Sequence, residues 1–171
     1  MSVAALISID EYLNTSYEPD CDYVDGALQV RNLGKKHHSR FQTALASYFF
    51  VREKQLGIRG YTEQRIRLSP SRVRIPDFCV LRREQPDEDV IEVPPFICVE
   101  ILSPDDSVSG MMERLEDYLA FGVPNVWLID PRRERSYLAT SSGLIEAHDN
   151  ILRTETPEIV VPITELFESV R

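Results

Sequence analysis

Residues 96–130, FICVEILSPDDSVSGMMERLEDYLAFGVPNVWLID, set the architecture of this chain. An apolar run opens the stretch at 96–103 and a second apolar run closes it at 125–130. Between them, Met111, Met112, Leu115, Tyr118 and Leu119 recur at helical spacing, and Gly122 is placed to end that helix. A strand, a helix and a strand in this order form a right-handed crossover with parallel strands. The stretch therefore predicts a βαβ unit.

Further elements are predicted on both sides of this unit. Ser8 and Glu11 form a capping box that opens a short helix, and Asp25-Gly26 marks a hairpin within 21–32. Helices are predicted over 37–57 and 163–170. Strands are predicted at 61–69, 74–81, 135–140, 143–149 and 158–161. This order predicts an α/β or α+β fold with one central mixed sheet flanked by helices, as a single domain over 1–171.

Composition limits the class of protein. With 171 residues, 43% of them hydrophobic, the chain is long enough for one globular domain with a real core. No apolar run approaches the roughly 18 residues that span a membrane, and the N-terminus lacks the pattern of a signal peptide. Cys21, Cys79 and Cys98 resemble small buried hydrophobes in a reducing compartment. We expect a cytoplasmic protein.

Charge is distributed unevenly along the chain. The net charge is −9, yet residues 31–83 hold thirteen Lys and Arg against three acids, a formal +10. This contrast favours a basic face set against an acidic remainder, which suits a nucleic-acid partner. The alternative is that these basic residues simply point outward from a solvated sheet face.

Two acids lie within runs that otherwise predict buried strands. Asp77 lies in RIPDFCVL at 74–81, and Glu100 lies in FICVEILSP at 96–104. A buried carboxylate costs several kcal/mol unless it is paired or binds a metal. Oxygen ligands without His or Cys nearby favour Mg²⁺ or Mn²⁺ over Zn²⁺. The pair therefore predicts a metal site, and the alternative is two separate salt bridges to arginines of the basic segment.

The chain also resembles a known family. A proline-aspartate on one strand, an acid about twenty residues later in an apolar strand, and then a helix is the order found in the PD-(D/E)XK nuclease superfamily. Within it the chain is similar to the Uma-two family of restriction-endonuclease-like proteins, long catalogued as a domain of unknown function. The resemblance covers nearly the whole chain through CDYVDGAL, HHSRFQTAL, YTEQRIRL, RIPDFCVL, PPFICVEILSPDDS and RLEDYLAFGVPNVWLIDP.

The resemblance implies a nuclease core with Asp77 and Glu100 as metal ligands. It also matches Glu63 to a family glutamate on the preceding strand and Asp22 to an early acid of the hairpin; each has the alternative of an exposed strand residue. His38 matches a family histidine at the start of a helix, where a capping or packing role is the more common one.

The superfamily lysine is missing from its usual place two residues after the acid, where Leu102 stands. In the resembled family the lysine lies on the next helix, four residues before a tyrosine, and Arg114 occupies that place before Tyr118. Helical geometry lets this arginine reach the strand ends near the two acids. Its alternative role is a salt bridge at the rim with Glu113 or Asp117.

The function predicted by these features is a Mg²⁺- or Mn²⁺-dependent DNA endonuclease. Asp77, Glu100, Glu63 and Arg114 would be its catalytic residues. A homodimer is expected by analogy with nucleases that act on duplexes. The alternatives are a catalytically silent relative that binds nucleic acid and a homo-oligomeric interaction protein. Predicted nucleic-acid contacts are Lys35, Lys36, His38, Arg65, Arg67 and Arg74.

Overall fold

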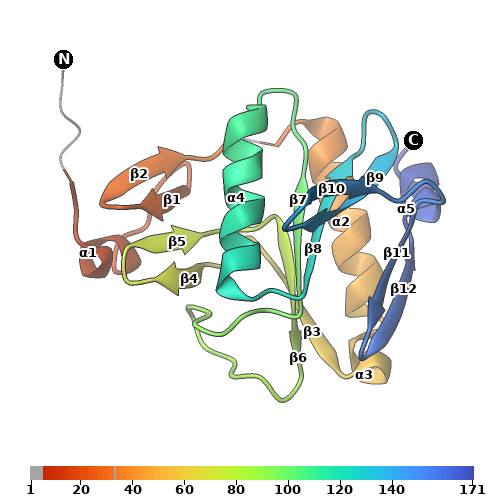
Figure 1. Ribbon diagram of the computed structural model, residues 1–171, viewed down its shortest axis with the longest axis horizontal. Coiled ribbons are helices and arrows are strands. Elements are labelled where there is room, and N and C mark those ends of the chain that lie inside the picture. Colours follow the sequence, from red (N-terminus) through yellow and green to blue (C-terminus); the bar gives the residue numbers. More distant parts are fainter. Residues whose placement is uncertain (1–5, 33) are drawn as a thin grey trace.

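A six-stranded mixed sheet forms the centre of the computed structural model, which describes residues 6–32 and 34–171 (Figure 1). Its strand order is β10-β9-β8-β7-β6-β3. A four-stranded sheet, β2-β1-β5-β4, and a two-stranded sheet, β11-β12, accompany it. The prediction of a mixed sheet flanked by helices is confirmed, and the two smaller sheets are additions to the predicted single one.

The strands are β1 (Cys21–Val24), β2 (Ala27–Val30), β3 (Ile58–Thr62), β4 (Ile66–Ser69), β5 (Arg72–Arg74), β6 (Phe78–Arg82), β7 (Ile97–Ile101), β8 (Asn125–Asp130), β9 (Arg135–Thr140), β10 (Gly143–Glu146), β11 (Ile151–Glu155) and β12 (Glu158–Pro162). The helices are α1 (Ile9–Leu13), α2 (Lys36–Phe50), α3 (Glu53–Leu56), α4 (Val108–Phe121) and α5 (Ile163–Ser169). Within the described residues, none of these helices is long and apolar enough to cross a membrane.

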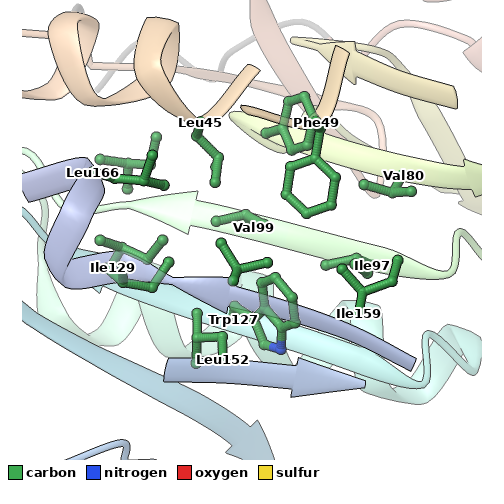
Figure 2. Packing of buried hydrophobic residues seen from close by; sticks show 14 of the residues in the cluster. Leu45, Phe49, Val80, Ile97, Val99, Trp127, Ile129, Leu152, Ile159 and Leu166 are labelled. Carbon is green, nitrogen blue, oxygen red and sulfur yellow. The ribbon is translucent and has the colours of Figure 1, made fainter. Parts of the chain in front are cut away.

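One face of the central sheet is covered by α2, α5 and the β11–β12 hairpin. Leu45 and Phe49 of α2 point toward Val99 and Ile97 of β7, and Trp127 of β8 is fully buried there (Figure 2). Apolar side chains thus close this face completely, which explains why β7 and β8 carry near-continuous hydrophobic runs. The predicted core position of Trp127 is confirmed.

The opposite face of the sheet is covered by α4 (Figure 1). Its apolar stripe, including Met111, Leu115 and Tyr118, packs on Cys79 of β6 and Cys98 of β7. β7 and β8 are parallel neighbours, so the predicted βαβ unit is confirmed. The three described cysteines are free and buried, as expected.

Local signals placed several boundaries correctly. Ser8 Oγ accepts a hydrogen bond from the Glu11 amide at 3.1 Å, which confirms the helix start. Asp25 and Gly26 both have positive φ (50° and 89°), the geometry of a tight hairpin turn between β1 and β2. Gly122 ends α4 with φ 98°, a left-handed conformation that glycine adopts without strain.

Two predicted elements are each divided in the structure. The helix expected over 37–57 breaks into α2 and α3 at Arg52. The Arg52 amide donates a hydrogen bond to the Phe49 carbonyl, and the Arg52 guanidinium donates one to the Tyr48 carbonyl, which interrupts the regular helical pattern. The strand expected over 61–69 ends at Thr62 and resumes at Ile66 in another sheet. The break occurs at Glu63, whose φ of 52° is a left-handed backbone conformation that is uncommon for residues other than glycine.

The register between β6 and β7 positions the two predicted acids. The strands are antiparallel, with Cys79 opposite Cys98 and Phe78 opposite Val99. Continued by one residue, the same register sets Asp77 opposite Glu100. Side chains directly opposite on antiparallel strands typically have Cβ atoms about 4.5–5.5 Å apart. The strand pairing therefore makes these two carboxylates cross-strand neighbours.

Candidate active site

Asp77 lies immediately before β6, with only 4% of its surface exposed. Its Oδ1 accepts a hydrogen bond from Arg31 Nη2 at 2.9 Å. Its Oδ2 lies 3.1 Å from His38 Nε2 and accepts from the Ile101 amide at 2.7 Å. Burial alone would raise the pKa of Asp77, but His38, Arg31 and that amide outweigh it and hold the pKa below its usual range. The carboxylate is therefore ionised and firmly oriented.

Glu100 lies on β7 with 1% exposure. Its Oε1 accepts a hydrogen bond from the Tyr118 hydroxyl at 2.7 Å. Its Oε2 is buried and has no hydrogen-bond donor among the described residues. Burial, followed by the nearby charge of Asp77, raises the pKa of Glu100 to about 8. The two acids therefore differ, since the pKa of Asp77 is lowered and the pKa of Glu100 is raised.

Arg114 of α4 reaches Glu100, one of the two acids that its helical position was predicted to approach. Its Nη1 lies 3.6 Å from Glu100 Oε2, and its Nε lies 3.6 Å from Asp22 Oδ2. Both separations exceed a good hydrogen bond, so the attraction is mainly between charges. The alternative role at the rim falls to other arginines, because Arg72 and Arg74 pair with Glu113 and Asp117 instead.

Arg74 is enclosed by acids under the start of the hairpin, with 1% of its side chain exposed. Nη1 bonds Asp22 at 3.0 Å and Gln29 at 2.8 Å, Nε bonds Asp117 at 2.7 Å, and Nη2 bonds Glu113 at 2.9 Å. This burial leaves no face of the guanidinium for a phosphate, so the predicted nucleic-acid contact by Arg74 needs correction to an internal ion pair. Asp22 is likewise buried rather than an exposed strand residue.

A cavity of ≈ 110 Å³ opens beside Asp77, at the N-terminal end of α2. Arg31, His38, Gln42, Glu63 and Asp77 are among the residues that line it. Gln42 joins two of them, because its Nε2 donates to the Asp77 carbonyl at 2.9 Å and lies 3.4 Å from Glu63 Oε1. Glu63 is exposed at this cavity, so the structure brings it together with Asp77.

The other predicted nucleic-acid contacts occupy different surroundings. Lys35 and Lys36 are exposed at the start of α2, and Lys35 pairs with Asp105 at 2.8 Å. Arg67 forms a partly exposed pair with Glu92 at 3.2 Å. Arg65 is held more tightly: it bonds Asp20 and three backbone carbonyls, and stacks over the Tyr12 ring. His38 is buried, and its Nε2 lies 3.1 Å from Asp77 Oδ2. The two lysines are thus the most exposed of the predicted contacts, although Lys35 is paired.

The donor set suits a hard divalent cation. Across residues 6–32 and 34–171, no group of three or more His, Cys, Asp and Glu side chains is arranged to hold a metal. Mg²⁺, however, is commonly held by one or two carboxylates, with water and substrate phosphates completing its shell. Asp77 and Glu100 supply two carboxylates, and the partnerless Glu100 Oε2 is a free ligand atom. The residues present fit Mg²⁺ or Mn²⁺ bound in this way.

Sequence reasoning overlooked several contacts at the site. Tyr118 appeared as a core residue of the helix stripe, yet its hydroxyl bonds Glu100. Its spacing of four from Arg114 puts both on one helix face, a signal that was available. The bond between Arg31 and Asp77 spans 46 positions in the chain, so no local pattern could reveal it.

Comparisons with known proteins bear on the fold and on the family of the chain. A search of curated proteins found no match. Among solved structures, "a putative nuclease belonging to DUF820 from Anabaena variabilis ATCC 29413" superposes with a TM-score of 0.81 at 22% identity, covering 96% of this chain and 99% of that one. A DrdV-DNA complex matches with a TM-score of 0.45 at 13% identity, over 80% of this chain and 12% of that one.

The first of these similarities identifies the fold as that of a solved nuclease-like protein. The sequence itself supplies the family assignment. A family model named Uma2, described as "Putative restriction endonuclease", matches residues 9–164. That match covers both acids, Arg114 and the cavity beside Asp77. The chain belongs to the Uma2 family.

Proposed function

We propose that this protein is a metal-dependent DNA endonuclease that hydrolyses phosphodiester bonds, with Asp77 and Glu100 as ligands of Mg²⁺ or Mn²⁺. One observation carries the proposal: the register of β6 and β7, continued by one residue, sets two buried acids opposite each other, and one oxygen of Glu100 has no donor in the described chain. Such a pair is costly to bury unless a cation compensates it. Membership of the Uma2 family supports a nuclease.

The surrounding residues have distinct roles in this proposal. Asp77 and Glu100 would hold Mg²⁺ or Mn²⁺, which would lower the pKa of a water and neutralise charge on phosphate oxygens. His38 and the Ile101 amide orient Asp77, and Tyr118 orients Glu100, as partners of ligating carboxylates commonly do. Glu63 assists from the lip of the cavity, where its carboxylate can accept a proton.

Arginine cannot replace every role of the superfamily lysine. Leu102 stands at the usual lysine position, and Arg114 is the predicted substitute near Glu100. A guanidinium binds phosphate and stabilises negative charge, but it does not accept a proton near neutral pH. Arg114 therefore contributes charge only, and a proton leaving the attacking water must go elsewhere.

DNA is proposed to approach along the start of α2. Lys35 and Lys36 are exposed there beside the cavity, and the helix N-terminus adds positive potential. Arg67 can contribute from the neighbouring sheet if its exposed pair with Glu92 opens. We also propose a homodimer, since two-fold symmetry presents one site to each strand of a duplex. Light scattering tests the dimer directly.

Cleavage of supercoiled plasmid in Mg²⁺ or Mn²⁺ tests the proposed activity. We expect nicked or linear product that disappears on chelation with EDTA. The isosteric variants Asp77→Asn and Glu100→Gln should lose cleavage. Asp87→Asn is a matched control, because Asp87 pairs with Arg59 on an exposed loop away from the cavity. Full cleavage by Asp77→Asn would refute the assignment.

A catalytically silent DNA-binding protein is the second candidate. Two observations favour it: Leu102 in place of the lysine, and the arginine and histidine that already bond both oxygens of Asp77. This candidate predicts that the wild-type chain binds DNA, with affinity falling steeply as salt rises, yet leaves plasmid intact in either metal.

A further inference from the structure

Arg31 and Arg114 approach the acid pair from different sides. The cavity beside Asp77 is lined by Arg31, whereas Arg114 and Glu100 do not contribute to its lining. About 10–15 Å³ accommodates one water, so a cavity of ≈ 110 Å³ can receive a phosphate group. Of these two arginines, Arg31 is therefore the one within reach of a phosphate in this cavity.

Arg31 is well placed for such a contact. It follows β2 directly, and 13% of its side chain remains exposed, toward a site whose other walls include His38 and Gln42. Its Nη2 bonds Asp77 Oδ1 at 2.9 Å, which leaves further guanidinium donors for another partner. Burial works against its charge, but Asp77 and Glu100 raise the pKa of Arg31 above its usual range, so the group stays cationic.

Arg114 has a different environment. It lies between Asp22 and Glu100, 3.6 Å from an oxygen of each, beneath the helix that carries it. Its charge compensates two buried acids in place, and the Tyr118 hydroxyl one turn later fixes the other oxygen of Glu100. These contacts orient Glu100 but do not reach the cavity.

We propose that Arg31 is the residue that contacts the phosphate of bound DNA, and that Arg114 is a positioning residue for Glu100. The inference rests on the proposed nuclease function and reassigns the role that the sequence predicted for Arg114. Arg31 neutralises Asp77 in the metal-free chain. When Asp77 serves as a metal ligand, Arg31 is released to present its fork of N–H groups to two phosphate oxygens.

Binding measurements separate the two arginines without any cleavage. The probes are Mn²⁺ alone, followed by calorimetry, and a fluorescein-labelled 20-base-pair duplex in Ca²⁺, followed by anisotropy at several salt concentrations. For Arg31→Gln we expect at least about 10-fold weaker DNA binding and a salt slope smaller by about 0.9. Its Mn²⁺ affinity should be unchanged or higher, because a competing cation is gone.

Arg114→Gln should show the reverse pattern. We expect weaker Mn²⁺ binding, because Glu100 loses its nearby charge, together with an unchanged salt slope for DNA. The reverse assignment, in which Arg114→Gln loses the salt slope and Arg31→Gln keeps it, overturns the inference. Should Arg31→Gln fail to fold, Arg31→Lys serves instead, because lysine keeps the positive charge but lacks the two parallel N–H donors of the guanidinium. Weaker DNA binding by Arg31→Lys with unchanged Mn²⁺ binding supports the inference, and unchanged DNA binding overturns it.

Failure of the nuclease proposal is recognised separately. If the wild-type chain binds DNA and Mn²⁺ but leaves plasmid intact, the nuclease proposal fails while the pattern of the two glutamine variants still decides the role of Arg31. If the wild-type chain binds neither probe, both proposals fail together.

Discussion

Replacing Arg74 with methionine tests the central ion-pair cluster of the hairpin. The substitution keeps an unbranched apolar stem but removes a guanidinium that bonds Asp22, Gln29, Asp117 and Glu113. Asp22, with 1% exposure, is then left with the Ile75 amide and the more distant Arg114 as its partners.

The expected loss follows from that burial. Removing one partner of a buried ion pair typically costs about 3–5 kcal/mol, because the other charge stays buried without compensation. Burial already raises the pKa of Asp22, and Arg74 is the main influence that lowers it. Without Arg74 the carboxyl takes up its proton at a higher pH than in the wild type. The loss should therefore shrink as the pH is lowered.

Urea denaturation followed by circular dichroism measures this loss. With a slope of about 1–3 kcal/mol per molar urea, the midpoint should fall by more than about 1 M. Arg67→Met is the matched control, since its partly exposed pair with Glu92 should contribute only about 0–1 kcal/mol. A loss for Arg74→Met no larger than that of the control would refute the reasoning, as would a loss that grows at low pH.

Three further predictions concern the site and the core. Burial raises the pKa of Glu100 in the folded protein from 4.5 to about 8. The metal-free protein should therefore lose stability as the pH rises from 4.5 to about 8, by up to about 1.4 kcal/mol per pH unit. In thermal unfolding, Glu100→Gln should reduce this dependence of stability on pH. Tyr118→Phe removes the hydroxyl that donates to Glu100 and should weaken Mn²⁺ binding about 2- to 12-fold in calorimetry. The control is Tyr23→Phe, which removes a hydroxyl bonded to the Ile7 carbonyl and should leave Mn²⁺ binding unchanged. Gly60→Ala would bring a methyl group 2.7 Å from the Phe78 ring and should lower stability by about 1–3 kcal/mol in urea; a neutral result would contradict that close approach.

The sequence predicted the βαβ unit well because the signal is local there. Met111, Leu115 and Tyr118 repeat at helical spacing, and Gly122 marks the end within the same short stretch. The position of Arg114 followed from the same periodicity, since a helix fixes which residues share a face. The structure confirms its approach to Glu100 at 3.6 Å.

Contacts between distant segments could not be predicted in this way. His38 matched a helix start, where capping is common, yet it lies 3.1 Å from Asp77, 39 positions later in the chain. Charge counting had a similar limit. The basic segment suggested a free positive face, but Arg59, Arg65 and Arg72 each pair with an aspartate from another part of the chain. Composition reveals how many charges a segment holds, and only the fold reveals which are neutralised.

The register between β6 and β7 has a consequence for how the chain becomes competent. Cys79 opposite Cys98 lies in the layer packed against α4, and Glu100, two residues after Cys98, faces Tyr118 and Arg114 on the same side. A slip of one residue would turn Glu100 into the apolar layer beneath α2, away from Tyr118 and Arg114. Under the proposed function, a chain with these strands mispaired would therefore lack the two-carboxylate metal site. The nuclease proposed above would thus be active only after these two strands have paired correctly.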